Sequence, residues 1–290
     1  MKVQRDVRFG LIPGLVAAVL VVGAPSVRAA DYTWDASGAA PPDDGAGDWN
    51  PTGGTNWYNG STYGAWGDTT ADVAIFGVGS GAAGTIAVGA VNANGITFNA
   101  PGSGSYTLSG GTITLGGTAP TISAAVNATI GSAIVGTSLT KTGAGTLTLT
   151  GTNTYTGATT VSNGTLNIAS TGALTGTSNV TTRTGGVLSI SGTLTMASNT
   201  YFAAGNGLSG TTGTNIVNSG ATVNLGGNAV LIGGSTSADG QYGQGTLTIN
   251  GGTVTVAAAS GTGGGSDINR IWLNPYGTSG TSTLNLNGGT

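Results

Sequence analysis

The fold is decided by the stretch Thr246-Leu-Thr-Ile-Asn-Gly-Gly-Thr-Val-Thr-Val256. It contains two short runs in which apolar and polar side chains alternate, and Gly251-Gly252 separates them. Successive side chains of a β-strand point to opposite faces, so each run predicts a strand with one apolar and one polar face. The apolar face has to be covered, and one such pair of strands cannot cover itself.

The same unit recurs along the chain, at residues 106–115, 146–151, 187–196 and 283–290. Its Leu anchors at 108, 147, 166, 188, 247 and 284 are separated by 39, 19, 22, 59 and 37 residues. These gaps lie near multiples of about 20 residues, the length of one coil in many stacked-repeat β folds. We therefore expect an all-β parallel β-helix (β-solenoid), with Gly-Gly at a corner between two faces. A meander of antiparallel hairpins is the alternative, because Asn-Gly-Gly also suits a hairpin turn.

The predicted solenoid covers residues 84–290, and the chain is expected to end within a repeat. The alternation assigns one apolar side chain in every two to its interior. The residues predicted to fill the core are Leu147, Leu149, Leu166, Ile168, Leu188, Ile190, Leu247, Ile249, Val254 and Val256.

The composition supports an all-β class. The 290 residues include 57 Gly, only 6% are charged, and there is no Glu, His or Cys. Helical bundles need Glu, Lys and Arg on their exposed faces, and charge-rich disorder needs far more ionic residues. Without Cys, an exported chain has no disulfides, so stability has to come from backbone hydrogen bonds and apolar burial.

Residues 1–29 have the layout of a secretory signal peptide. Lys2, Arg5 and Arg8 precede an apolar stretch at 11–24, and cleavage is expected after Ala29. That stretch is shorter than a membrane-spanning helix, although an uncleaved anchor is the alternative. We therefore expect no transmembrane segment in the mature chain. Beyond residue 29 the chain carries three basic residues and nine Asp, a net charge of −6, which disfavours binding to nucleic acid.

A more specific pattern occupies residues 139–168. Its distinctive positions are Lys141, Gly143, Gly145, Leu147, Leu149, Gly151, Asn153, Tyr155, Gly157, Thr160, Val161, Gly164, Thr165, Leu166 and Ile168. In these features the stretch resembles the autotransporter-associated β-strand repeat, a passenger-associated repeat of exported bacterial proteins. The resemblance implies a right-handed β-helix that is secreted, lies at the cell surface and is associated with the outer membrane in its full-length form.

In that family the passenger is usually a stalk or a binding surface and seldom catalyses a reaction. The resemblance therefore implies a non-catalytic surface scaffold for adhesion or display, with an extracellular glycan or a cell-surface component as partner. The alternative is an extracellular β-helix protein that binds or cleaves polysaccharide.

Residues 30–80 are rich in Trp and Asp and are predicted to form an N-terminal cap. Trp34, Trp49, Trp57, Trp66 and Tyr58 lie there. They either close the first coil, which would otherwise expose strand edges, or form an aromatic platform that contacts a glycan.

The chain offers little for catalysis or for a cofactor. Without His, Cys or Glu it cannot assemble a Ser-His-Asp triad, a Cys-His pair or a zinc-hydrolase site.

We read Asp267 and Arg270 as a surface ion pair, and the Gly-rich stretch 205–210 as a chance match to a dinucleotide-binding pattern. The acids at 35, 43, 44, 48, 68 and 72 are read as solvated turn residues; Ca²⁺ ligation is possible but has no regular ligand spacing. Rows of outward Thr also suit ice binding, but Thr is a favoured exposed strand residue.

Overall fold

The computed structural model describes residues 30–117, 119–198, 200–205, 211–226, 229–233, 243–256, 271–273 and 282–288. In these ranges every regular element is a β-strand. The described residues include no helix that could span a membrane. The predicted signal peptide at 1–29, the pair Asp267 and Arg270, and most of the stretch 205–210 lie outside these ranges.

The strands form three sheets, each of which is one long face of the molecule. The twelve-stranded sheet contains, in spatial order, β4 (Tyr63–Gly64), β3 (Trp57–Tyr58), β1 (Asp31–Trp34), β5 (Val73–Phe76), β7 (Gly95–Phe98), β9 (Thr121–Ala124), β12 (Leu139–Thr142), β15 (Thr159–Val161), β18 (Val180–Thr182), β21 (Tyr201–Ala204), β24 (Ala229–Ile232) and β27 (Ile271–Leu273). The eleven-stranded sheet contains β2 (Gly47–Trp49), β6 (Thr85–Ala93), β8 (Thr107–Leu115), β10 (Ala128–Ile130), β13 (Thr146–Leu149), β16 (Thr165–Ile168), β19 (Gly186–Ile190), β22 (Thr212–Val217), β25 (Gln244–Ile249) and β28 (Thr283–Leu286), and β11 (Ala133–Gly136) pairs with β8. The five-stranded sheet contains β14 (Thr152–Asn153), β17 (Ala173–Thr177), β20 (Thr193–Met196), β23 (Thr222–Asn224) and β26 (Thr253–Thr255).

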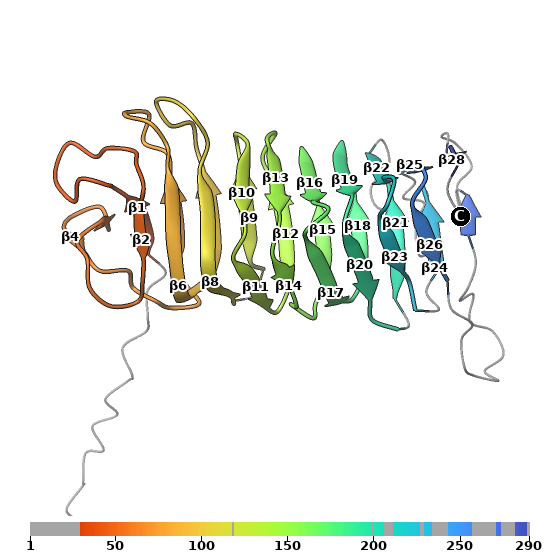
Figure 1. The fold of residues 1–290 in the computed structure, drawn as a ribbon, viewed down its shortest axis with the longest axis horizontal. Coiled ribbons are helices and arrows are strands. Elements are labelled where there is room, and N and C mark those ends of the chain that lie inside the picture. Colours follow the sequence, from red (N-terminus) through yellow and green to blue (C-terminus); the bar gives the residue numbers. More distant parts are fainter. Residues whose placement is uncertain are drawn as a thin grey trace, which may run out of the picture.

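The chain winds through the sheets in turn, and each winding lies on the one before it (Figure 1). One coil runs from β13 through β14 and β15, and β16 then pairs with β13 in parallel. Among the strands described, only β1 with β3 and β3 with β4 pair antiparallel. The predicted parallel β-solenoid is therefore confirmed. The antiparallel meander is wrong outside the small hairpin at the N-terminal end.

Coil length is not constant along the solenoid, which corrects the predicted spacing. The pair Thr146–Thr165 defines a coil of 19 residues, whereas Thr246–Thr283 defines one of 37. The 59-residue gap between two Leu anchors is therefore two coils rather than three. Stacking requires equivalent strands but not equal connections, because a longer surface connection adds little closure entropy.

The Gly-Gly corner is confirmed in one repeat and wrong in another. Gly251-Gly252 links β25 in the eleven-stranded sheet to β26 in the five-stranded sheet. Gly110-Gly111, by contrast, lies inside the continuous strand β8, whose two halves pair with β10 and β11. Gly110 has φ +86°, a conformation that other residues rarely adopt, so Gly at this place serves the strand itself.

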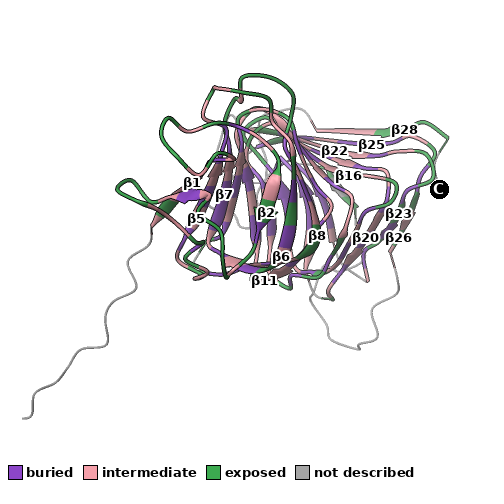
Figure 2. Ribbon diagram, turned by 60° about the vertical axis from the view of Figure 1, so that its left-hand side comes forward, coloured by how far each residue is buried: buried purple, intermediate pink, exposed green. Residues whose placement is uncertain are grey.

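The core consists of columns of inward side chains that continue from coil to coil. In Figure 2 residues coloured as buried recur in the strands of successive coils. One column contains Ile86, Leu108, Ile130, Leu149, Ile168, Ile190, Val217, Ile249 and Leu286. Of the ten predicted core residues, eight are buried. Val254 and Val256 are only partly buried, near the last described coil.

The last described members of the inward columns are exposed. Ile271, Leu273 and Leu286 are 54%, 55% and 63% accessible, respectively. They belong to β27 and β28, beyond which no described strand lies. Burial therefore depends on a neighbouring coil on each side.

Candidate functional site

The distinctive residues of 139–168 build one coil and tie it to its neighbours. β12 places Lys141 on the inward face, in the column between Ile122 and Val161. Its side chain is fully buried, and its Nζ donates to the carbonyl oxygens of Thr142 at 2.8 Å and Gly143 at 2.8 Å. A third bond, of 3.1 Å, reaches the carbonyl of Asn163 in the following coil. The ammonium group thus joins two successive coils at one corner.

That corner needs glycine because the coils approach closely there. Gly143 has φ +78° and Gly164 has φ +60°. A Cβ on Gly143 would collide with the backbone of Ala124, and one on Gly164 would lie 2.6 Å from the carbonyl oxygen of Gly145. At positions 145, 151 and 157 a Cβ would likewise collide with the backbone of the preceding coil, so these positions also need glycine.

Asn153 is a second tie, and it spans three coils. It is fully buried, and its Oδ1 accepts from the amide of Ile134 at 3.0 Å. Its Nδ2 donates to the carbonyls of Gly151 at 2.9 Å and Ala173 at 3.0 Å. The side chain therefore adds bonds to backbone groups of three successive coils beside the short strand β14, the buried amide of Ile134 among them.

Tyr155 begins a buried chain of hydroxyl groups. Its Oη lies 2.9 Å from Oγ1 of Thr159, which lies 2.9 Å from Oγ1 of Thr177. Thr177 donates to the carbonyl of Gly157 at 2.8 Å, which closes the chain. Burial raises the pKa of Tyr155, so the phenol stays protonated. This network holds the interior of two coils together without any charge.

We expect Asn153→Ala to lower the free energy of unfolding by about 2 to 3 kcal/mol, because the buried amide of Ile134 loses its side-chain partner and two part-buried bonds to the carbonyls of Gly151 and Ala173 are lost as well. Guanidinium denaturation followed by circular dichroism measures this. Asn167→Ala is the matched control, since Asn167 lies on the outer face of β16 and should change stability by less than about 0.5 kcal/mol. Equal effects at the two sites would contradict the assigned role of Asn153.

The pH dependence of stability should report on Lys141. Burial lowers the pKa of Lys141 to about 8. Between that value and about 10.4, the ordinary pKa of Lys, the unfolded chain holds a proton that the folded chain has lost, so stability rises with pH. We expect a gain of about 1 to 2 kcal/mol between pH 8 and 9.5. Denaturation curves of Lys141→Met should lack this rise, and an unchanged slope in the variant would contradict the assignment.

The four predicted Trp residues of the cap form a single buried cluster. Trp34, Trp49, Trp57 and Trp66 are 0 to 3% exposed, and the rings of Trp57 and Trp66 lie 4.8 Å apart. Trp34 Nε1 donates to the carbonyl of Gly45, and Trp66 Nε1 donates to that of Asn92. No sugar ring could stack on these indoles as they are placed. Tyr58 is partly exposed, and its ring lies 5.0 Å from that of Tyr63.

Several cap carboxylates hold loops in place instead of facing solvent. Asp35, Asp44 and Asp72 are buried. Asp44 Oδ1 accepts from the amide of Val78 at 3.0 Å, and Asp72 Oδ2 accepts from that of Thr69 at 3.1 Å. Burial alone would raise the pKa of Asp35, but bonds from Asp43 and Ser37 lower it. The reading of these three acids as solvated was wrong. Among the described residues no group of acidic side chains could hold a metal ion.

Sequence reasoning missed the burial of Lys141. The signal was present, because Leu139 and Lys141 are two residues apart in β12 and so share a face. It also missed the buried Asn215, whose Oδ1 accepts from Thr182 at 3.1 Å.

A comparison with protein-family models matches this same segment. Residues 139–168 match the family model described as passenger-associated-transport-repeat. The chain is also similar to the adhesin BmaC autotransporter of Brucella suis biovar 1 (strain 1330), with 37% identity over 134 residues. That alignment covers 43% of this chain and 4% of the relative. No solved structure matches the chain. Residues 139–168 are therefore similar to the passenger-associated-transport-repeat, and they fold as successive strands of a parallel β-solenoid.

Proposed function

We propose that this chain is an exported, non-catalytic passenger that acts as a surface scaffold for adhesion or display on a bacterial cell. One observation carries the proposal: the repeat at 139–168, characteristic of passengers, supplies the ties that hold a parallel solenoid together. Its residues are used for stacking, which is what an extended stalk needs. The relative that carries the word adhesin in its name adds support for contact with a surface.

A non-catalytic role agrees with the side chains available. The chain has no His, Cys or Glu, and the buried cap acids bond to backbone amides. Outward columns of the solenoid carry uncharged groups such as Thr107, Thr129 and Thr148. Such a surface suits contact over a large area better than acid-base chemistry, for which titratable groups have to be close together.

The function can be tested in the organism that encodes the protein. An epitope inserted between Thr184 and Gly185, in an exposed turn, should be labelled by antibody on intact cells. Deletion of residues 30–290 should reduce attachment of the cells to host cells or abiotic surfaces. Labelling only after lysis, or attachment unaffected by the deletion, would refute the proposal.

A further inference from the structure

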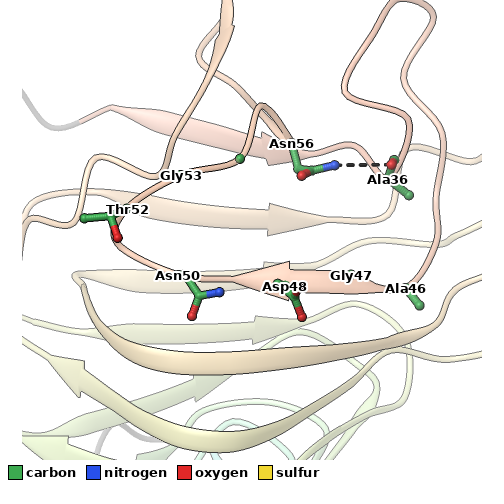
Figure 3. A pocket seen from close by; sticks show the side chains of 9 residues that line it. Ala36, Ala46, Gly47, Asp48, Asn50, Thr52, Gly53 and Asn56 are labelled. Carbon is green, nitrogen blue, oxygen red and sulfur yellow. Dashed lines mark hydrogen bonds between the residues drawn. The ribbon is translucent and has the colours of Figure 1, made fainter.

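A polar hollow of about 280 Å³ lies at the N-terminal end of the solenoid (Figure 3). It is open to solvent and is bordered by β2, by the loop that follows β2 and by the segment before it. Its lining residues are Ala36, Ala46, Gly47, Asp48, Asn50, Thr52, Gly53, Gly54 and Asn56. Pockets for drug-sized ligands span roughly 300 to 1,000 Å³, so this hollow suits one small unit.

The polar side chains of the hollow are free to bind a ligand. Asp48, Asn50 and Thr52 are exposed, and none of them hydrogen-bonds to another residue in the described part of the chain. In this respect Asp48 differs from Asp44 and Asp72, which are used to hold loops. Asn56, on the opposite wall, is fixed by bonds from its Nδ2 to the carbonyls of Asp35 and Ala36.

Backbone groups add further donors and acceptors. β2 is the terminal strand of its sheet among the described residues, and it pairs only with β6. Its other edge therefore leaves amide and carbonyl groups unpaired. Gly53 and Gly54 have φ +80° and +83°. No heavy atom lies within 4 Å of the Cβ position of Gly53, so a ligand could reach the backbone there.

The floor of the hollow is rigid. A Cβ on Gly47 would lie 2.6 Å from the ring of Trp34, so β2 rests directly on the buried Trp cluster. The Asn50 side chain lies over Gly89 of β6, which has no Cβ to displace it. A binding site held by a packed core loses little entropy when a ligand binds.

The lining chemistry identifies the class of ligand. No Lys, Arg or His lines the hollow, so an anionic group would find no counter-charge. A single carboxylate accepts bonds from hydroxyl groups, and the amide of Asn50 can both donate and accept. The Nδ2 of Asn56 is already bonded to two carbonyls, so Asn56 offers its Oδ1 as an acceptor.

We propose that this hollow binds one neutral sugar unit of an extracellular polysaccharide, through Asp48, Asn50, Asn56 and the free edge of β2. The inference deepens the proposed adhesive function and rests on it for its biological use. Binding itself is independent of that function, because it is measured on the purified chain.

The test uses ¹⁵N-labelled protein titrated with neutral tetrasaccharides, namely cellotetraose, maltotetraose and tetra-N-acetylchitotetraose. Trigalacturonate and sialyllactose serve as acidic probes. At least one neutral probe should shift the side-chain amide signals of Asn50 and Asn56 in a saturable way. Asp48→Ala and Asn50→Ala should each weaken binding at least tenfold. Asp31→Ala changes an exposed residue and Asn167→Ala a partly exposed one, both outside the hollow, and both variants should leave the dissociation constant unchanged.

A further variant perturbs the hollow without removing a lining group. Gly89→Ala should push the Asn50 side chain aside and weaken binding several-fold, while circular dichroism stays that of the wild type. The proposal would be overturned if none of the neutral sugars bound, or if the acidic sugars bound more tightly. It would also be overturned if the control variants lost as much affinity as the hollow variants. An extended neutral hexapeptide should also be titrated in place of the sugars. If it alone shifted the backbone amide signals of β2, the sugar proposal would be overturned. If cells that carry Asp48→Ala still attach, the proposed adhesive function is not contradicted, because it does not depend on this hollow alone.

Discussion

Replacing Leu147 with Asp should lower the free energy of unfolding by more than about 4 kcal/mol, the largest single effect that we expect in this chain. Leu147 is fully buried in β13, between Ala128 of the preceding coil and Leu166 of the following one. A carboxylate there would have no partner, because the inward column contains only apolar groups at these levels. The interior would have to open, and two neighbouring coils would lose their packing with it.

Guanidinium denaturation combined with amide hydrogen exchange measures this effect. Exchange should accelerate first in β10, β13 and β16, since coils stabilise mainly their nearest neighbours. Thr148→Asp is the matched control, because Thr148 is the next residue of the same strand and faces outward. It should change stability by no more than about 0.5 kcal/mol. Similar losses in the two variants would show that the inward and outward faces are wrongly assigned.

Trp57→Ala should destabilise the cap by about 4 kcal/mol, within the range for removal of a large buried aromatic ring. The Trp57 ring touches those of Trp34 at 5.3 Å, Trp49 at 5.4 Å and Phe76 at 5.5 Å, besides Trp66. Its loss would leave a cavity at the centre of the cluster. Because β1 pairs with both β3 and β5, the first strands of the solenoid should fray together with the cap.

Tryptophan fluorescence and hydrogen exchange follow this change. Exchange should rise in β1, β3 and β5 and remain slow from β13 to β19. Tyr58→Ala is the control, because Tyr58 is the neighbouring residue, is partly exposed and contacts Tyr63 outside the cluster. It should cost about 1 kcal/mol. A cap that exchanges no faster in Trp57→Ala than in Tyr58→Ala would contradict a packed aromatic core.

The strand interiors could be predicted from the sequence because their signal is local. In the run of β13, Leu147 and Leu149 alternate with Thr, and burial follows that alternation without exception. The repeat at 139–168 was also recognisable from the sequence. Its glycines allow neighbouring coils to approach closely, and Asn153 hydrogen-bonds to the backbone of a neighbouring coil. Parallel stacking followed from the need to cover every apolar face.

What could not be predicted depends on which residues become neighbours across coils. Asn215 occupies the column of Leu188 and Leu247, although the run of β22 does not reveal that Asn faces inward and Ile216 outward. Coil length was also hidden, because connections vary while the strand register is kept. The residues that line the hollow at Asp48 all lie within 36–56, but the bends of that stretch, which bring them together, leave no periodic pattern in the sequence.

The most direct test of the stacked parallel coils is a series of spin-label distances along one outward column. Thr85 is aligned with Thr148, Ser189 and Thr248 at three, five and seven coils, respectively, through successive register pairs. Adjacent strands lie about 4.8 Å apart, so labels at these pairs should be separated by about 14, 24 and 34 Å. The chain has no Cys, which lets each pair be labelled cleanly. A steady increase of about 10 Å for every two coils is the expected result, and distances that stay level or fall along the series would contradict the solenoid.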